Sequence, residues 1–336
     1  MKYSFVIPVF NRPDEISELL ESLSNQTFKD FEVIIVEDGS KIDCKKEVEQ
    51  YKDKLDIKYF YKKNERPAIA RNYGVAHAKG EYVIFVDSDV IVPQKYLEIV
   101  DNYLRKNQVD AYGGLDAAAQ NFNALQKAIS YAMTSFITSG KIRSGQKIDR
   151  YYPRSFNMGI KRQVFINIKG FPITKMWPGE DIVFAIEIIR NGYKTALISE
   201  AYVYHKRRNT IKSFFVQVFR FGKTRYIISR VYPETFKIFY LFPSIFVLGT
   251  IVLLFLSLWK WWFILPILLY AFIVFIDSLI KNKSFKVAIL SIIIAFVQHF
   301  GYGLGFLSAI FKGDKYNVVK NGFYQKNNIY FDRINK

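Results

Sequence analysis

The chain has 336 residues, a formal net charge of +18 and a hydrophobic fraction of 50%, which is enough apolar material for one large domain or two smaller ones. Its single cysteine, Cys44, excludes an intramolecular disulfide framework and any metal cluster held by several cysteines. An excess of Lys and Arg is typical of proteins that bind nucleic acid, anionic lipid or phosphorylated substrates, so its distribution has to decide between them.

The first 208 residues have the pattern of an α/β domain. Apolar, β-branched or aromatic runs predict buried strands at 3–9, 32–36, 57–61 and 82–86. Pro13 and Pro67 each predict the start of a helix between strands. Alternating strands and helices indicate a mainly parallel sheet, in which ligands bind at the carboxyl ends of the strands. The N-terminus lacks the pattern of a secretory signal, so we expect this domain in the cytoplasm.

Paired acids follow two of the predicted strands. Asp87 and Asp89, separated by one serine, come directly after 82–86. Two carboxylates there repel each other unless a cation compensates them, and a divalent metal that carries a diphosphate would do so. Such a triplet is also common in turns and helix caps. Glu37 and Asp38 follow the strand at 32–36, where Asp38 can accept from a base N–H.

A third acidic motif, Trp177-Pro178-Gly179-Glu180-Asp181, precedes a predicted helix at 182–190. The two acids have two interpretations, since carboxylates are common in the first turn of a helix. Loops rich in Trp, Pro and Gly are also good places to hold a general base against a substrate.

The segment 206–236 combines many cations with apolar residues at three- and four-residue intervals, such as Ile211, Phe214 and Val218. This pattern predicts an amphipathic helix whose apolar face enters the headgroup boundary while its cations meet lipid phosphates. A solvated basic linker and a nucleic-acid patch are the alternatives. Attachment to a membrane segment favours anionic lipid as the partner over nucleic acid.

Three segments at 239–258, 261–280 and 287–311 are long and apolar enough to cross a membrane. Lysines between the second and third indicate a cytoplasmic loop. Three crossings would then place the basic tail, 312–336, outside, against the positive-inside bias. One segment being re-entrant or interfacial would remove the conflict, and Gln298, His299 and the nearby glycines make the third segment the candidate.

In residues 1–208 the order of motifs resembles that of family-2 glycosyltransferases of the GT-A fold. The motifs are FVIPVFNR, VEDGS, ARNYGVAHAKGEYVIFVDSD, FNMGIKR, WPGEDIVFAIEIIRNGYK and AYVYH. The resemblance implies an α/β GT-A catalytic domain that binds a nucleotide-diphosphate sugar. It implies the following donor-binding residues: Pro8, Val9, Glu37, Asp38, Arg71, Asp87 and Asn157.

The same resemblance implies roles in the reaction. Asp89, with Asp87, would bind Mn²⁺ or Mg²⁺, and His205 matches a position that completes the metal shell in some relatives; a lone His after a strand is otherwise more often structural. Asp181 would be the base that removes the acceptor proton, with inversion at the anomeric carbon, and Glu180 would assist or bind acceptor.

Residues Gln217 to Phe221 resemble the Q-x-x-R-W element that covers the diphosphate and acceptor end in membrane-embedded sugar polymerases. Phe replaces Trp here, which weakens the case for a polymerase. Gln217 and Arg220 share a helix face, and Arg220 could stabilise the leaving diphosphate. The stretch 298–306 resembles the last segment of membrane-anchored family-2 transferases that build exopolysaccharide or lipid-linked glycans.

The sequence therefore predicts four regions: a GT-A domain at 1–208, a basic interfacial segment at 209–236, a membrane region at 237–311 and a basic tail at 312–336. The leading interpretation is an inverting, metal-dependent transferase that adds a sugar to a polyprenyl-diphosphate-linked glycan at the cytoplasmic face of the inner membrane. Alternatives are a processive polysaccharide synthase, a polyprenyl-phosphate sugar synthase, and a non-catalytic membrane scaffold with a degenerate sugar-nucleotide fold.

Overall fold

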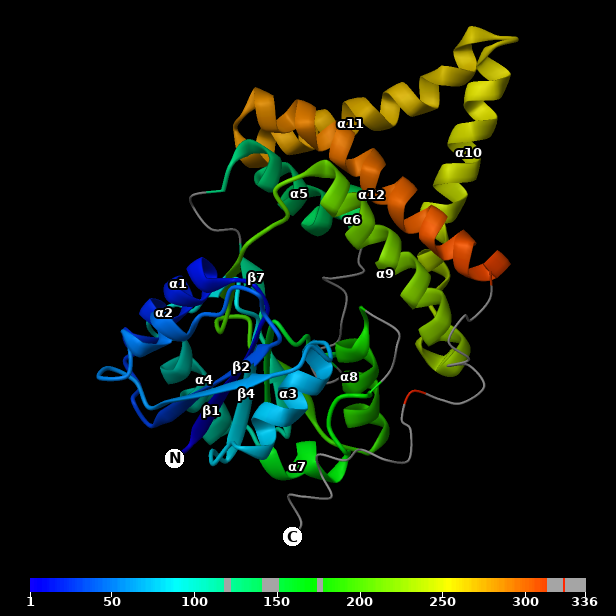
Figure 1. Ribbon diagram of the computed structural model, residues 1–336. Coiled ribbons are helices and arrows are strands. Elements are labelled where there is room, and N and C mark those ends of the chain that lie inside the picture. The colour runs from blue at the N-terminus through cyan, green and yellow to red at the C-terminus, as the bar shows by residue number, and fades with distance from the viewer. Residues whose placement is uncertain (118–121, 141–150, 174–177, 313–322, 324–336) are drawn as a thin grey trace.

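The computed structural model describes residues 1–117, 122–140, 151–173, 178–312 and 323. Figure 1 shows an α/β domain that carries the N-terminus and a group of long helices beside it. The predicted tail at 312–336 lies outside the described residues except for Lys312 and Phe323, and Trp177 of the third acidic motif also lies outside them.

A seven-stranded sheet forms the centre of the α/β domain. Its strands are β1 (Tyr3–Val9), β2 (Phe31–Asp38), β3 (Ile57–Lys62), β4 (Tyr82–Val86), β6 (Ala111–Gly113), β8 (Asn157–Lys161) and β9 (Thr195–Leu197). The order is β3-β2-β1-β4-β8-β6-β9, and only β8 runs antiparallel to its neighbours. The mainly parallel sheet and the four strands expected from the apolar runs are confirmed.

Helices cover both faces of this sheet, because successive side chains of a buried strand point to opposite faces. Phe5 and Ile7 of β1 pack with one set of helices, whereas Val6 packs with the other. The first set is α1 (Pro13–Ser24), α2 (Lys45–Glu49) and α4 (Tyr96–Lys106); the second is α3 (Pro67–Ala76), α7 (Arg162–Asn167) and α8 (Glu180–Arg190). Pro13 and Pro67 begin α1 and α3, as predicted.

A second, three-stranded sheet has the order β5 (Val90–Ile91), β10 (Val203–His205) and β7 (Asp116–Ala117). Its strands are only two or three residues long; a strand before His205 was expected, but β5 and β7 were not. This small sheet brings two parts of the site together, because β5, which follows Asp89, pairs with β10, which ends in His205.

The remaining long helices form the second part of the molecule (Figure 1). They are α5 (Ala124–Thr134), the short α6 (Phe136–Ser139), α9 (Ile211–Val231), α10 (Phe242–Ser257), α11 (Leu265–Asn282) and α12 (Phe285–Lys312). Three segments are long and apolar enough to cross a membrane, namely Ile238–Ser257, Trp261–Asn282 and Phe285–Lys312. The proposed regional boundaries stay predictions, and α5 and α6 pack against α11 and α12 although they belong to the stretch 1–208.

Helix α9 confirms the helix predicted in the basic segment but corrects the surroundings of its apolar face. Phe214 and Val218 are 0% and 3% exposed and pack against α5 and α12. These side chains do not reach lipid, because the small residues of α12 cover them: a Cβ on Gly301 would overlap the Val218 side chain. The apolar stripe of α9 is therefore a protein interface.

Candidate active site

Three side chains with metal-ligating atoms meet just beyond the carboxyl end of β4. Asp87 and Asp89 follow Val86, and the pairing of β5 with β10 places His205 opposite Val90. The Nε2 atom of His205 lies 3.3 Å from Oδ1 of Asp89. One ligand atom each from Asp87, Asp89 and His205 lies within 4.8 Å of the other two. The structure thus brings the three predicted metal ligands together.

The chemistry of this cluster fits a divalent cation. Carboxylate oxygens and an imidazole nitrogen suit Mn²⁺, and the oxygens suit Mg²⁺. Among the described residues, Oδ1 of Asp89 and Nδ1 of His205 are buried without a hydrogen-bond partner. Burying a polar atom without a partner costs free energy unless a ligand supplies the missing contact. A cation bound between the two carboxylates would satisfy the Asp89 oxygen.

Arg12 supplies positive charge to the same place. Its guanidinium Nη1 forms an ion pair with Oδ2 of Asp89. Burial by itself would raise the pKa of Asp89, but His205 and Arg12 together hold that pKa well below its ordinary value. Burial would likewise lower the pKa of His205, and the Asp89 carboxylate instead raises it. Asp89 is therefore ionised at neutral pH.

Arg71 of α3 connects the cluster of Asp87, Asp89 and His205 with the acids of α8. It is 3% exposed; its Nη2 donates to Asp87 Oδ1 at 2.7 Å and its Nη1 lies 3.4 Å from Glu180 Oε1. Its guanidinium also lies 5.4 Å from the ring centre of Phe171. Because one rigid cation reaches both acids, Asp87 and Glu180 are held in a fixed relation.

Glu180 and Asp181 occupy the first turn of α8. The helix begins after Gly179, whose φ of 122° is in the region that favours glycine, and the Gly179 N–H donates to Glu180 Oε2 at 3.0 Å. Asp181 Oδ1 accepts from the Ile182 N–H at 2.8 Å, and its Oδ2 accepts from Arg154 Nε at 2.7 Å.

These surroundings shift the pKa values of the two neighbouring acids in opposite directions. Burial and the charge of Asp181 raise the pKa of Glu180. Burial would also raise the pKa of Asp181, but Arg154, with a smaller effect from Arg71, lowers it. Since the pKa of Asp181 lies below its ordinary value, Asp181 is ionised at neutral pH, which is the state that a general base requires.

Glu37 and Asp38 hold loops together at the end of β2. Glu37 is fully buried and accepts from Ser40 Oγ, the Cys44 N–H and Tyr59 OH. Its oxygens therefore have donors inside the protein, and its expected place in the nucleotide pocket stays a prediction. Asp38 accepts from Lys62 Nζ at 3.0 Å and from the N–H groups of Glu65 and Arg66 at 2.9 and 2.8 Å.

Asn157, expected to bind the donor, is enclosed by protein in this structure, and its role in binding stays a prediction. It is fully buried; its Nδ2 donates to the Ala201 oxygen at 2.8 Å, and its Oδ1 accepts from Tyr96 OH at 2.6 Å. Its polar groups therefore bind neighbouring segments of protein. Pro8 and Val9 lie at the carboxyl end of β1, beside the strand that precedes Asp87, and their contact with a nucleotide stays a prediction.

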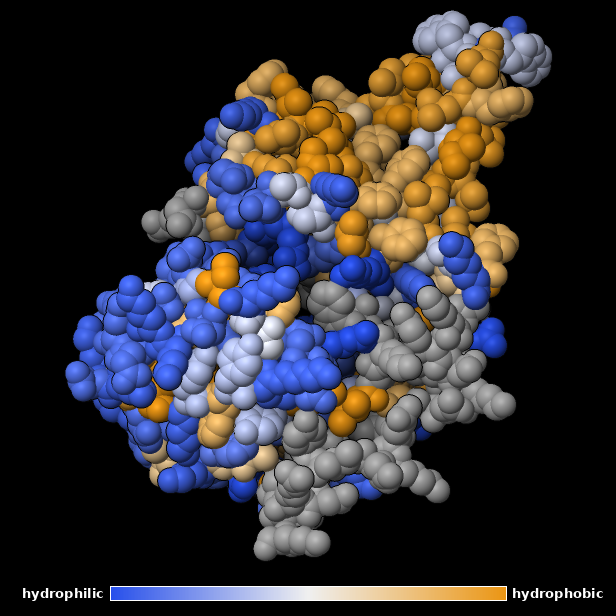
Figure 2. Space-filling view, in the orientation of Figure 1, coloured by the Kyte–Doolittle hydropathy of each residue, from blue (hydrophilic) through white to orange (hydrophobic). Residues whose placement is uncertain are grey.

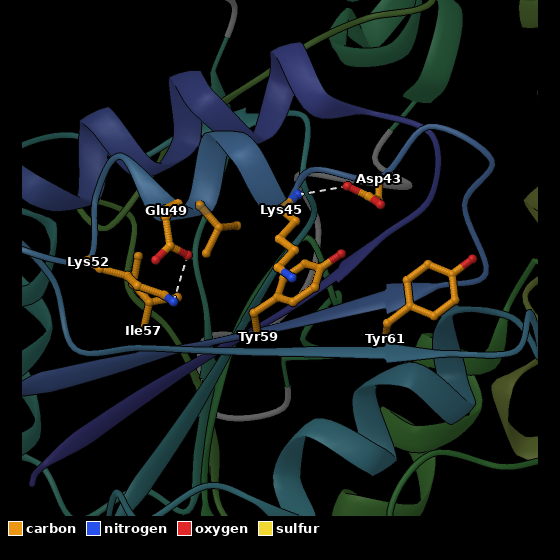
Figure 3. A pocket seen from close by; sticks show the side chains of 8 residues that line it. Asp43, Lys45, Glu49, Lys52, Ile57, Tyr59 and Tyr61 are labelled. Atoms are coloured by element: carbon orange, nitrogen blue, oxygen red, sulfur yellow. Dashed lines mark hydrogen bonds and ion pairs between the residues drawn. The ribbon is translucent and has the colours of Figure 1, made fainter.

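A separate surface groove of about 550 Å³ lies between α2 and β3 (Figure 3). Residues that line it include Lys45, Glu49, Lys52, Tyr59 and Tyr61, and Lys52 is paired with Glu49 at 2.7 Å. Since β3 is the edge strand and β4 lies three positions further along the sheet, this groove is distinct from the acid cluster.

Comparison with known families matches residues 4–169 to the model described as "Glycosyl transferase family 2". The chain carries a family 2 glycosyltransferase domain. The expected family and class of enzyme are thereby confirmed at the level of the domain. The matched stretch of this family 2 domain contains Asp38, Asp87, Asp89 and Asn157, whereas Asp181, His205 and α9 follow it.

Relatives of the family 2 domain include a poly(ribitol-phosphate) β-N-acetylglucosaminyltransferase, TarP, of Staphylococcus aureus. It is 29% identical over 222 residues, which are 63% of this chain and 64% of TarP. An uncharacterized glycosyltransferase of Rickettsia felis is 42% identical over 106 residues, which are 32% of this chain and 18% of that protein. The chain thus spans less than two thirds of the length of these relatives.

Solved structures show the same fold. S. aureus TarS 1–349 superposes with a TM-score of 0.52 at 23% identity and covers 68% of this chain and 64% of its own. The mannosyltransferase PcManGT of Pyrobaculum calidifontis, solved in complex with GDP-Man and Mn²⁺, gives a TM-score of 0.52 at 19% identity, covering 66% and 62%. The expected GT-A fold is confirmed.

Helix α9 touches the loop that leads into the acids of α8. Thr224 Oγ1 donates to the Pro178 oxygen at 2.8 Å, and a Cβ on Gly179 would overlap the Thr224 methyl group. Gln217 and Arg220 precede Thr224 by seven and four residues, so all three lie on one side of the helix. Their contact with a diphosphate or acceptor stays a prediction, but they share the face of α9 that touches this loop.

Sequence reasoning missed the two arginines that pair with the key acids of the family 2 domain. Arg12 follows β1 and so lies at the same edge of the sheet as Asp89, which was a usable signal. Arg154 precedes the FNMGIKR motif and is separated from Asp181 by 27 positions, and no local pattern predicts that pairing.

Proposed function

We propose that this protein is an inverting, metal-dependent glycosyltransferase that moves a sugar from a nucleotide-diphosphate sugar to an acceptor held at a membrane. The observation that carries the proposal is the cluster of Asp87, Asp89 and His205, linked through Arg71 to Glu180 and Asp181. A site for a divalent metal ion next to a buried ionised acid is the arrangement that this transfer requires.

In this proposal the chain holds the donor at the carboxyl ends of β1, β2 and β4. Asp87, Asp89 and His205 hold Mn²⁺ or Mg²⁺, which when bound neutralises charge on the leaving diphosphate. Arg12 lies against Asp89 and is placed to add a donor to a diphosphate oxygen. Arg220 and Gln217 of α9 cover the same end of the site.

Asp181 then acts as the base. Its Oδ2 removes the proton of an acceptor hydroxyl, and that oxygen bonds to the anomeric carbon from the side opposite the leaving diphosphate, so the configuration inverts. Arg154 keeps Asp181 ionised until the proton arrives. Glu180, fixed by Arg71 and the Gly179 N–H, assists in binding the acceptor.

The helical part of the molecule supports an acceptor at a membrane surface. Three candidate spans follow the basic helix α9, and α9 contacts the Pro178 loop. We propose a multi-pass protein of the inner membrane with its catalytic domain in the cytoplasm, in contact with anionic lipids. The acceptor is a lipid-linked glycan; the TarP name favours a poly(ribitol-phosphate) chain as the second candidate.

The test uses membranes that contain the full chain, a panel of nucleotide-sugars and both acceptors. We expect EDTA-sensitive release of nucleoside diphosphate that depends on one acceptor, and its loss in Asp89→Ala. Asp30→Ala, at a surface acid that is 56% exposed, is the matched control and keeps activity. Equal release by Asp89→Ala would refute the metal role.

Product length separates the remaining alternatives. Addition of one sugar supports a single transfer, a ladder of products indicates a processive synthase, and a charged polyprenyl phosphate indicates a lipid-phosphate sugar synthase. A folded protein that releases no diphosphate from any donor would be the non-catalytic scaffold.

A further inference from the structure

Helix α12 lies lengthwise along α9, the basic helix, and packs on it more extensively than on any other element. Gly301 faces Phe215 and Val218, while Gly305 faces the backbone of Phe219, so the two helices run in the same direction. Gly222 of α9 in turn has no room for a Cβ beneath the Tyr302 oxygen. This close contact means that α9 and α12 lie at the same depth relative to any membrane.

The charges of α9 limit that depth. Its 21 residues include five exposed or half-buried cations, namely Lys212, Arg220, Lys223, Arg225 and Arg230. Placing such charges at the centre of a bilayer is energetically costly, because they lose their hydration. Arg225 also lies 4.4 Å from the ring centre of Tyr240, just before α10 begins. Helix α9 therefore lies at the headgroup level, and α12 lies there beside it.

The exposure of α12 is one-sided. Phe285, Ile289 and Ile293 are 65%, 44% and 45% exposed at four-residue intervals, and Phe311 is 84% exposed on the same face. The opposite face, including Val287, Ile294 and Phe306, is buried against α5 and α9. The middle of α12 also contacts α10 and α11, where Tyr270 OH lies 2.7 Å from His299 Nε2 and Ser244 Oγ donates to the Gly303 oxygen at 3.3 Å. An apolar outer stripe over a polar protein layer is the pattern of an interfacial helix.

Phe323 gives an independent observation. It is 2% exposed, and its ring stacks on Tyr232 at the end of α9 with 5.9 Å between ring centres. The same cluster contains Val183 and Ile186 of α8. A residue eleven positions beyond the end of α12 thus packs against the catalytic side of the molecule.

Helices α10 and α11 have different surroundings. Their candidate spans are 28% and 11% buried, compared with 44% for that of α12. Figure 1 shows the turn between them projecting away from the α/β domain while α11 runs back to α5 and α12, and Figure 2 shows their surface as almost uniformly hydrophobic up to that turn. That turn carries Trp259, Trp261 and Trp262, with Lys260 among the rings, as expected at a membrane interface.

We propose that α10 and α11 cross the membrane as a hairpin, while α12 does not cross but lies in the interface beside α9, with its outer apolar stripe in the acyl-chain boundary. The occupant of this stripe is the bilayer leaflet that faces the catalytic domain. Two crossings return the chain to its starting side, so Lys312 lies on the side of the α/β domain.

Single-cysteine labelling tests this arrangement in the full chain. A Cys44→Ser background keeps a hydroxyl at the buried position where the thiol lies 3.0 Å from Glu37. Cysteines then replace Lys52 of the α/β domain, Lys260 of the hairpin turn or Lys312 at the end of α12, all exposed. Two preparations of sealed vesicles, right-side-out and inside-out, are each treated with a membrane-impermeant maleimide. Labelling after addition of detergent gives the total number of reactive cysteines at each site.

We expect Lys52→Cys and Lys312→Cys to label from one side of the membrane and Lys260→Cys from the other. Labelling of Lys312→Cys together with Lys260→Cys would mean that α12 crosses and would overturn the proposal. Labelling of all three from one side would overturn the hairpin. A reporter fused after Lys336 gives a second reading of the tail without any substitution in a helix. Neither assay depends on glycosyl transfer, so its outcome is separate from that of the proposed activity.

Discussion

Arg154 sets the protonation of the proposed base, and its removal should change the pH dependence of the reaction. Its Nε donates to Asp181 Oδ2 at 2.7 Å, and it lowers the pKa of that acid against the effect of burial. A base must be ionised, so kcat/KM falls as the pH falls through its pKa. In Arg154→Met the burial remains and the cation is lost. An opposite charge at this range shifts a pKa by about 1 to 3 units, so we expect the acid limb to move to higher pH by that amount.

The assay is the pH profile of diphosphate release between pH 4 and 8, on the order of ten points. Arg154→Lys is the matched control, because it keeps a cation near Asp181 and should keep the limb close to that of the unmodified protein. Asp181→Asn should lose transfer while donor binding persists. If Arg154→Met lowers the rate at every pH but leaves the limb in place, Asp181 is not the titrating base and the reasoning is wrong.

Three further predictions concern other contacts. Thr224→Val removes the hydrogen bond to the Pro178 oxygen, worth about 1 kcal/mol, so kcat should fall about fivefold at unchanged donor KM. Thr224→Ser keeps the hydroxyl and should keep the kcat of the unmodified protein. Equal kcat in the two variants would contradict a positioning role for Thr224. Gly222→Val should destabilise the protein in detergent by about 1 to 3 kcal/mol, because a Cβ at this position overlaps the Tyr302 oxygen. Gly249→Ala is the control, since a Cβ there meets nothing within 4 Å and should not change the unfolding midpoint. Similar unfolding midpoints for the two variants would refute the tight packing of α9 on α12. Glu32→Gln should cost about 1.5 to 3 kcal/mol of unfolding free energy at pH 7, since this buried carboxylate accepts from Lys58 and Ser4. Burial alone would raise the pKa of Glu32 but Lys58 lowers it, so the difference between Glu32→Gln and the unmodified protein should shrink as the pH falls below about 4.5; a difference that grows in acid would contradict the assignment.

The main sheet was predictable from the sequence because its strands are long apolar runs. Strands β1 to β4 each have five or more residues, and in β1, β2 and β4 most side chains are buried on both faces, whereas the edge strand β3 is half-buried. The strands β5, β7 and β10 have two or three residues and are held by pairing across distant parts of the chain, which no local period reveals. His205 could thus be recognised by resemblance but not placed beside Asp89 by pattern.

The acids of the site could be found, but their partners could not. A carboxylate after a strand or before a helix has a local signature, as Asp87 and Asp181 have. Whether that carboxylate is available to a ligand depends on donors that approach from elsewhere, as the buried Glu37 demonstrates with Tyr59. Periodicity likewise identified the apolar face of α9, but it could not show whether that face contacts lipid or the glycines of α12.

The packing of α12 on α9 has a practical consequence for dissecting this molecule. Removing everything after α9 would uncover Phe214, Val218 and the small residues around Gly222, which α12 now keeps from water. The same deletion would remove the support that α12 gives to α9, the helix whose Thr224 donates to the Pro178 oxygen. A shortened protein made for solubility would therefore tend to aggregate and to lose the geometry of the Pro178 loop together, so that α12 acts as part of the protein's core.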